Sequence, residues 1–193
     1  QQMEQSFLQI KKLVNEPYSG ILGYPKATKR QVESRISELK KLGISHVSFQ
    51  GKTRIGILNV LGKGYVGVVV LAKRRNKIFA LKIRRLDSQR EGMKNEANLL
   101  KLANKVGVGP ILLNSTKNFL VMEFLDGEKI GDWINLLSGK RSVDKIKSVI
   151  RKILEDCYNL DQVGFDHGEL SSIVKHVIVG KKTTIDRKST RLN

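Results

Sequence analysis

The feature that most limits the possible folds is the glycine-rich stretch "LGKGYVGVVV" at residues 61–70. Its glycines, Gly62, Gly64 and Gly67, run directly into valines, which favour a β-strand. A dinucleotide-binding fingerprint needs its glycines to open a helix, and a P-loop needs Gly-Lys-Ser/Thr after a strand. The stretch therefore predicts a strand-turn-strand hairpin, whose backbone amides can cover phosphate groups from above. A plain tight hairpin would explain the same glycines.

A lysine inside an apolar strand gives the second constraint. The stretch "IFALKI" predicts a strand over residues 78–83 that contains Lys82, where an unpaired ammonium would be costly to bury. Ser88 and Glu91 form a capping-box pattern that predicts the start of a helix. The apolar stripe of this helix consists of Met93, Ala97, Leu100 and Ala103. Because Glu96 falls inside that stripe, we expect it to pair with Lys82; the pair alone could also be purely structural.

Composition indicates a folded protein. The 193 residues are 40% hydrophobic and 28% charged, which is typical of soluble globular chains. The longest apolar run, residues 66–72, is too short to span a bilayer, and the first ten residues lack the pattern of a signal peptide. The single cysteine, Cys157, cannot form an internal disulfide. We therefore expect a cytoplasmic address and no membrane partner.

The net charge of +18 is unusually high. Thirty-six Lys and Arg against eighteen acids can attract phosphates, either on a nucleotide or along a nucleic acid. The same residues can equally be the solvated face of an ordinary domain. Charge alone does not decide between these two interpretations.

The region 1–43 is predicted to be helical. Thr28 and Gln31 form a capping box, and Gly43 is expected to end the helix that follows. Its apolar face consists of Val32, Ile36, Leu39 and Leu42, and its basic outer face of Arg30, Arg35, Lys40 and Lys41. A packed helix with a basic outer face explains this pattern, and a helix that recognises nucleic acid is the alternative.

The rest of the chain divides into two regions. Residues 44–124 read as strands interrupted by one helix; the strands are "HVSF", "RIGILNV", "VGVVVLA" and "IFALKI". From residue 125, Trp133 is expected to anchor the start of a helix, and a strongly amphipathic helix follows. The apolar face of that second helix consists of Ile146, Val149, Ile150, Ile153, Leu154 and Cys157. The sequence "HVIVGKKTTI" predicts a hairpin that turns at Gly180-Lys181.

The order of these motifs resembles a protein kinase. The glycine stretch, then Ala80-Leu81-Lys82, then Glu96, is similar to the kinase N-terminal lobe, and "VMEF" occupies the position of the hinge. "DHGEL" at residues 166–170 resembles the His-Gly-Asp-Leu catalytic loop of compact atypical kinases, the RIO kinases and the kinase of the KEOPS complex. The nearest resemblance, over residues 61–186, is to small archaeal predicted Ser/Thr kinases.

The resemblance implies an α+β, two-lobed kinase-like fold with a β-rich N-lobe, one key helix and a shortened helical C-lobe. Residues 1–43 would be an N-terminal helical extension and 44–124 the N-lobe. Residues 125–193 would be a partial C-lobe that ends just after the metal-binding position.

The same resemblance implies a role for each site residue. The catalytic residues would be Lys82, held by Glu96 on the α and β phosphates of ATP, Glu169, which orients the attacking hydroxyl, and His167, which braces the loop. ATP would also be bound by Gly62, Lys63, Gly64, Gly67, Val69, Ala80, Met122, Glu123 and Phe124, the last three at the hinge. Asp186 would bind Mg²⁺.

Three departures from the family pattern bear on the expected kinase activity. Glu169 stands where the family has aspartate, which predicts slow chemistry, and Val174 replaces the catalytic-loop asparagine, so the second metal ligand is unassigned. No Phe-Gly follows Asp186, which suggests a truncated chain or a foreign tail; Gln1-Gln2 before Met3 suggests a similar remnant.

Two functions are therefore compatible with the sequence. The first is an ATP-dependent Ser/Thr protein kinase that can include itself among its substrates, with the protein substrate unknown. The alternative is a weakly active or inactive nucleotide-binding module that holds RNA or a ribonucleoprotein on its basic surface. A zinc site is not expected, because His46, His176 and Cys157 lack ligand spacing.

Overall fold

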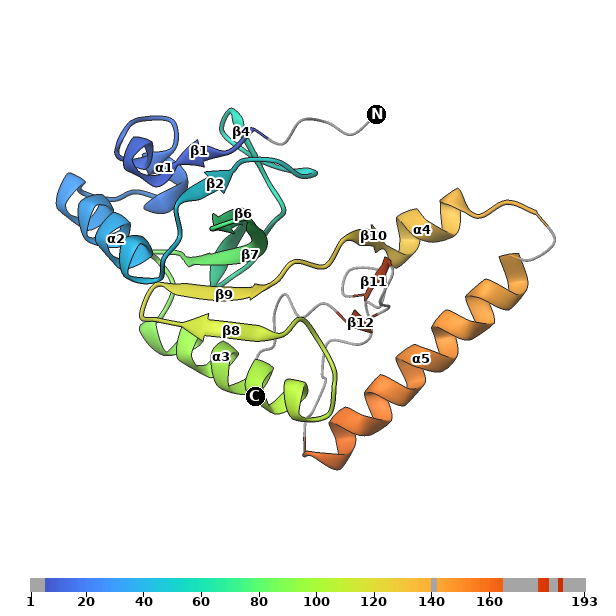
Figure 1. The fold of residues 1–193 in the computed structure, drawn as a ribbon. Helices are drawn as coiled ribbons and strands as arrows, with labels where there is room; N and C mark the ends of the chain where they lie inside the picture. The colour runs from blue at the N-terminus through green and yellow to red at the C-terminus, as the bar shows by residue number, and fades with distance from the viewer. Residues whose placement is uncertain (1–5, 140–141, 165–176, 181–183, 186–193) are drawn as a thin grey trace. The chain divides into compact units, whose positions relative to one another are not determined.

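The computed structural model (Figure 1) describes residues 6–139, 142–164, 177–180 and 184–185. Two units account for the chain. Unit 1 consists of residues 1–97 and 112–124, and unit 2 of residues 98–111 and 125–193. One division falls inside helix α3 (Arg90–Lys105), so the first part of this helix belongs to unit 1.

The N-terminal segment contains more than the predicted helix. It forms β1 (Leu8–Gln9), the 3-10 helix η1 (Ile10–Val14), α1 (Ser19–Leu22) and α2 (Lys29–Lys41). The capping box predicted at the start of α2 is confirmed, since the backbone N–H of Gln31 donates to the Thr28 hydroxyl and the Gln31 side chain accepts from the Thr28 N–H. The purely helical prediction is wrong for β1, which pairs with the next strand.

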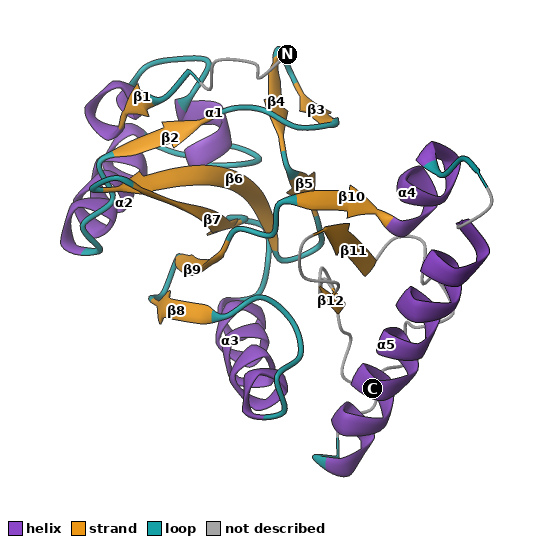
Figure 2. Ribbon diagram, turned by 45° about the vertical axis from the view of Figure 1, so that its right-hand side comes forward, coloured by secondary structure: helices purple, strands orange, loops and turns teal. Residues whose placement is uncertain are grey.

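Unit 1 is built on an antiparallel sheet. Its strands are β1, β2 (His46–Ser48), β5 (Gly62–Lys63), β6 (Gly67–Arg74), β7 (Lys77–Arg84), β8 (Leu112–Ser115) and β9 (Phe119–Glu123). The order is β1-β2-β6-β7-β9-β8, and β5 pairs with β6 beyond this path (Figure 2). The valine-rich stretches form strands that pair antiparallel with their neighbours, an arrangement that short turns can connect.

One predicted strand is a hairpin instead. The stretch "RIGILNV" folds as β3 (Thr53–Ile55) and β4 (Leu58–Val60), which pair with each other. Gly56 lies between them with φ of +59°, a conformation that glycine adopts without steric cost. The turn at Gly56 therefore divides the predicted strand into two paired strands.

The two faces of the sheet differ in what they carry. Side chains alternate along a strand, and residues paired in register share a face. Val68, Val70, Leu81 and Val121 lie on the face that packs into the main hydrophobic cluster. Val69, Lys82 and Leu120 occupy neighbouring register positions on the opposite face. Lys82 therefore points away from the main core of unit 1.

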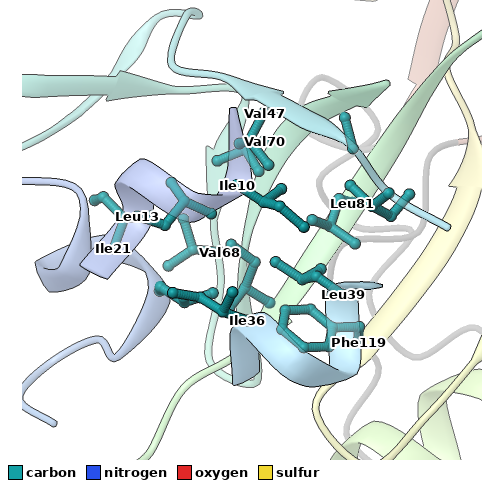
Figure 3. Close-up of a cluster of buried hydrophobic side chains, with 14 of the residues drawn as sticks. Ile10, Leu13, Ile21, Ile36, Leu39, Val47, Val68, Val70, Leu81 and Phe119 are labelled. Atoms are coloured by element: carbon teal, nitrogen blue, oxygen red, sulfur yellow. The ribbon is translucent and has the colours of Figure 1, made fainter. Parts of the chain in front are cut away.

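The main core lies between the sheet and the N-terminal helices (Figure 3). Ile36 and Leu39 of α2 and Leu13 of η1 pack with sheet residues such as Val70 and Phe119. Leu39 and Phe119 are fully buried, with 0% of their surface exposed. Burying such side chains contributes about 1.5–3 kcal/mol each, so this layer is the main source of stability for unit 1.

Unit 2 combines helices with a small sheet. Its elements are the C-terminal part of α3, β10 (Gly127–Lys129), α4 (Ile130–Leu136), α5 (Ser142–Gln162), β11 (Val177–Gly180) and β12 (Thr184–Ile185). The sheet order is β10-β11-β12, and the predicted pairing of the last two strands is confirmed. Trp133 is partly buried against the cluster formed by Val149, Ile153 and their neighbours, which agrees with its predicted role as an anchor.

The predicted apolar face of α5 is only partly right. Val149 and Ile153 are buried, whereas Ile150 and Leu154 are 48% and 64% exposed. Asp156 occupies a buried position on the helix and forms an ion pair with Lys152. The spacing alone could not rank these positions, because the apolar side chains cover a wider arc than the core does.

Candidate functional site

Lys82 and Glu96 form a buried ion pair in unit 1, as the sequence predicts. Lys82 lies in the middle of β7 and is 2% exposed, while Glu96 of α3 is 9% exposed. The Lys82 ammonium donates a hydrogen bond to the Glu96 Oε1 atom. Each buried charge would be strongly destabilising without the other, so the pair fixes α3 against this face of the sheet.

The start of α3 differs from the prediction in detail. The helix begins at Arg90, so Ser88 is not its N-cap. Instead, the Ser88 hydroxyl donates to the carbonyl oxygen of Arg85 at 2.8 Å. The predicted stripe is nevertheless correct, because Met93, Ala97, Leu100 and Ala103 are all buried.

The glycine stretch is a hairpin, as predicted. Gly62 and Lys63 of β5 pair with Val69 and Val68 of β6, and the Gly64 N–H donates to the Gly67 carbonyl oxygen at 2.8 Å. A strand follows Gly67, which excludes the strand-to-helix turn of a dinucleotide-binding fingerprint. The second strand of the hairpin, β6, also pairs with β7, where Val69 lies opposite Lys82.

Gly67 is required by close packing against β7, the strand that contains Lys82. A Cβ atom at this position would lie 2.7 Å from the Ile83 carbonyl oxygen and 3.0 Å from the Lys82 Cγ atom. The first distance is too short for any side chain. Gly67 therefore lets β6 and β7 approach each other closely beside the Lys82 side chain.

We expect Gly67→Ala to destabilise unit 1 by about 1–3 kcal/mol, because the new methyl group would force β6 and β7 apart. Urea unfolding followed by circular dichroism measures the change. Gly92→Ala is the matched control, since its Cβ would meet the Val66 Cγ2 atom at an ordinary 3.4 Å. The control should leave stability unchanged or slightly raised. Equal stability of Gly67→Ala and the wild type would contradict the close packing.

An apolar surface lies beside Lys82. Ala80 pairs in register with Met122, and alternation along β7 puts both on the Lys82 face together with Val69. These three side chains are 8–9% exposed. Glu123 ends β9 and Phe124 follows it; both are partly buried. An apolar surface of this kind suits a planar ring.

Lys63, predicted to contact the nucleotide, is held by a residue that the sequence did not suggest. Its ammonium donates to the Tyr24 hydroxyl at 2.6 Å and lies 4.6 Å from the centre of that ring. Tyr24 lies between α1 and α2, 39 residues before Lys63. No sequence pattern links two positions so far apart.

A second network missed by the sequence centres on Arg35. The prediction that this residue lies on the exposed basic face of α2 is wrong, because Arg35 is only 2% exposed. Its Nη1 atom donates to the carbonyl oxygens of Leu22 and Arg84, and its Nη2 atom to the Asn118 Oδ1 atom. Burial and the nearby Arg84 charge lower the pKa of Arg35 to about 10, although the Glu38 carboxylate acts in the opposite direction.

Arg84 and Asn118 extend this network to the start of α3. The Asn118 Oδ1 atom also accepts from Arg84, whose Nη1 atom donates to the Ser88 carbonyl oxygen at 3.3 Å. Glu38 accepts from the backbone N–H and the side-chain amide of Asn118. A helix on one face of the sheet is thereby tied to the segment that leads into α3.

The remaining predicted site residues, His167, Glu169 and Asp186, lie outside the described residues. Among the residues that the structure does describe, no three His, Cys, Asp or Glu side chains gather in a way that could hold a metal ion. No helix in the described part of the chain has the length and apolar character needed to cross a membrane.

Comparisons with known proteins point to kinases. No protein-family model matches the sequence. The chain is 29% identical over 145 residues to CBL-interacting protein kinase 21 from Oryza sativa subsp. japonica, a match that covers 70% of this chain and 27% of the plant protein. The crystal structure of Rad53 residues 1–466 in complex with AMP-PNP superposes with a TM-score of 0.55 and 20% identity. That match covers 81% of this chain and 43% of the Rad53 chain.

These matches define the fold. The similarity to the Rad53 structure confirms the predicted α+β, protein-kinase-like fold. The chain spans about a quarter of the plant kinase and less than half of the Rad53 chain. The more specific resemblance to RIO, KEOPS and archaeal kinases stays a prediction.

Proposed function

We propose that this chain is an ATP-dependent Ser/Thr protein kinase of the compact atypical type, which can also phosphorylate itself. One observation carries the proposal: Lys82, buried and paired with Glu96 of α3, lies on β7 opposite Val69 of the glycine hairpin. A structural ion pair would not need the hairpin. The relatives named as a protein kinase and as a complex with AMP-PNP support the same assignment.

The residues present fit ATP. Lys82 is a cation fixed by Glu96 on the sheet face that also carries Val69, Ala80 and Met122. A triphosphate would meet the lysine and the amides of the hairpin, while adenine would lie on the apolar surface. ATP supplies the phosphoryl group that is transferred.

Each residue then has a defined task. Lys82 binds the α and β phosphates, and Glu96 keeps its ammonium oriented toward them. The hairpin at Gly62, Gly64 and Gly67 covers the phosphates and limits access of water. The backbone at Glu123 and Phe124 orients the adenine edge through hydrogen bonds.

The remaining tasks rest on the family resemblance. Glu169 would accept the proton of the attacking hydroxyl, and His167 would brace its loop. Asp186, a hard oxygen ligand, would hold Mg²⁺ against the phosphates.

Transfer of radiolabelled γ-phosphate tests the proposal, with the wild type compared with Glu169→Gln. Loss of the base is expected to lower kcat by about 10²–10⁴-fold, because glutamine has the shape of glutamate but cannot take a proton. Stabilisation by Mg·ATP should persist in the variant. Glu155→Gln, an exposed position on α5, is the control and should transfer at the wild-type rate. Equal rates in the wild type and Glu169→Gln would contradict the role of Glu169, and no transfer by the wild type would contradict the proposal.

A cluster of exposed cations supports an alternative function, a weakly active or inactive nucleotide-binding module that holds RNA. Lys40 and Lys41 end α2, and Arg74, Arg75 and Lys77 surround the turn between β6 and β7. The Arg74 side chain lies beside Gly43, directly after the two lysines of α2. RNA affinity that falls steeply with salt, without phosphate transfer, would favour this alternative.

A further inference from the structure

Two segments of unit 1 meet at Tyr24. Lys63 of the glycine hairpin lies 4.6 Å from the ring centre and donates to its hydroxyl at 2.6 Å. The Arg85 guanidinium, after β7, lies 5.2 Å from the same centre. The Tyr24 carbonyl oxygen accepts from the Leu86 N–H at 2.8 Å. Tyr24 thus contacts the hairpin and the segment that follows the lysine strand.

Arg85 joins these contacts to the tip of the hairpin. Its backbone N–H donates to the Val66 carbonyl oxygen at 2.9 Å, and its Nη1 atom donates to the Gly64 carbonyl oxygen at 3.2 Å. Asp87 accepts two hydrogen bonds from the same guanidinium, at 2.8 and 2.6 Å. The hydrogen bond from Arg85 lowers the pKa of Asp87, and the Asp87 carboxylate raises the pKa of Arg85. The guanidinium is therefore fixed in one orientation, which a single exposed ion pair would not achieve.

We propose that Tyr24 is a positioning residue for the glycine hairpin: it contacts Lys63 through its hydroxyl and its ring, and Arg85 through its ring. The effect on nucleotide binding rests on the proposed function. Free glycine hairpins sample many conformations, and ordering one on binding costs conformational entropy. An anchor already present in the free protein removes part of that cost. The segment before α2 thereby sets how tightly phosphates are bound.

The contacts separate two contributions. The hydroxyl of Tyr24 fixes the Lys63 ammonium, and the ring provides a cation–π surface to both cations. Tyr24→Phe removes the first and keeps the second, whereas Tyr24→Ala removes both. The effect should therefore be graded, larger for alanine than for phenylalanine.

Two measurements test the proposal, both against Tyr158→Ala, a control at an exposed tyrosine of α5. The first is amide hydrogen exchange of the nucleotide-free protein. Exchange at residues 62–67 should be about threefold faster in Tyr24→Phe and about tenfold faster in Tyr24→Ala, because each lost contact weakens the closed hairpin. This readout does not depend on nucleotide binding. Exchange that equals the wild type in both variants would overturn the proposal.

The second measurement compares the affinities for ATP and for adenosine. ATP should bind about tenfold more weakly to Tyr24→Ala, whereas adenosine, which has no phosphates to meet the hairpin, should bind as it does to the wild type. An equal loss for both ligands would show general damage to the fold and overturn the positioning role. If the wild type binds neither ligand, the kinase proposal fails, and the exchange measurement alone decides the role of Tyr24.

Discussion

Lys82→Met is expected to abolish phosphate transfer and also to lower stability. The substitution removes the cation proposed to bind the α and β phosphates and leaves Glu96 buried without its partner. An uncompensated buried charge costs about 3–5 kcal/mol, so the single variant loses stability as well as activity. Loss of transfer in this variant alone would not separate a catalytic role from a structural one.

The double variant Lys82→Met with Glu96→Leu separates them. Replacing both members of a buried pair by apolar side chains is often neutral or stabilising, so the free energy of unfolding should return close to the wild-type value. Phosphate transfer should stay undetectable, because no cation remains at the site. Lys94→Met, at an exposed position of α3, is the control and should keep both properties. A stable double variant that transfers phosphate at the wild-type rate would contradict the role of Lys82.

The second large effect is expected at Arg35. Arg35→Met removes the donors to two backbone carbonyls and to the Asn118 amide oxygen, all in a buried region. The Asn118 Oδ1 atom keeps its hydrogen bonds from Arg84, whereas the Leu22 and Arg84 carbonyl oxygens lose this donor. Loss of a buried hydrogen bond of this kind costs about 1–3 kcal/mol, and relief of the repulsion from Arg84 offsets part of the loss. We expect a net destabilisation of about 3 kcal/mol, measured as the free energy of unfolding in urea.

Arg30→Met provides the comparison for Arg35, because Arg30 is exposed on the same helix. It should change stability by no more than about 0.5 kcal/mol. If both variants have the same stability, the buried network does not contribute as described. A larger loss at Arg35 than at Arg30 would support a tie between α2 and the segment that leads into α3.

The sequence predicted the parts of the site that depend on local patterns. The apolar stretch around Lys82 placed it in a strand, and the helical period of 3.6 residues placed Glu96 in the buried stripe of α3. Each charge would be costly to bury without the other, so the pair could be inferred. The glycines and valines of the hairpin carry their own conformational preferences. These features need no knowledge of distant contacts.

The burial of Arg35 follows from the same helical period. Around the helix, Arg35 falls between Leu39 and Leu42, inside the apolar stripe. The rule that identified Glu96 as buried would therefore have identified Arg35. Its long side chain suggested an exposed position, but its donors are satisfied by carbonyls of three distant segments.

Other features could not be predicted because they depend on tertiary contacts. Tyr24 reaches Lys63 only because α1 and α2 pack on the sheet, and the pairing of β1 with β2 depends on the same packing. The exposure of Ile150 and Leu154 likewise depends on which part of α5 has neighbours. Patterns of apolar residues give a direction for a side chain and not the identity of its partner.

The most direct test of the central claim is thermal unfolding of the wild type and of the Lys82→Met, Glu96→Leu double variant, each with and without Mg·ATP. A ligand present at 100 times its dissociation constant should stabilise the wild type by about 2.7 kcal/mol. The account predicts this stabilisation in the wild type and none in the double variant. No shift in the wild type, or equal shifts in both proteins, would contradict a kinase-type nucleotide site at Lys82.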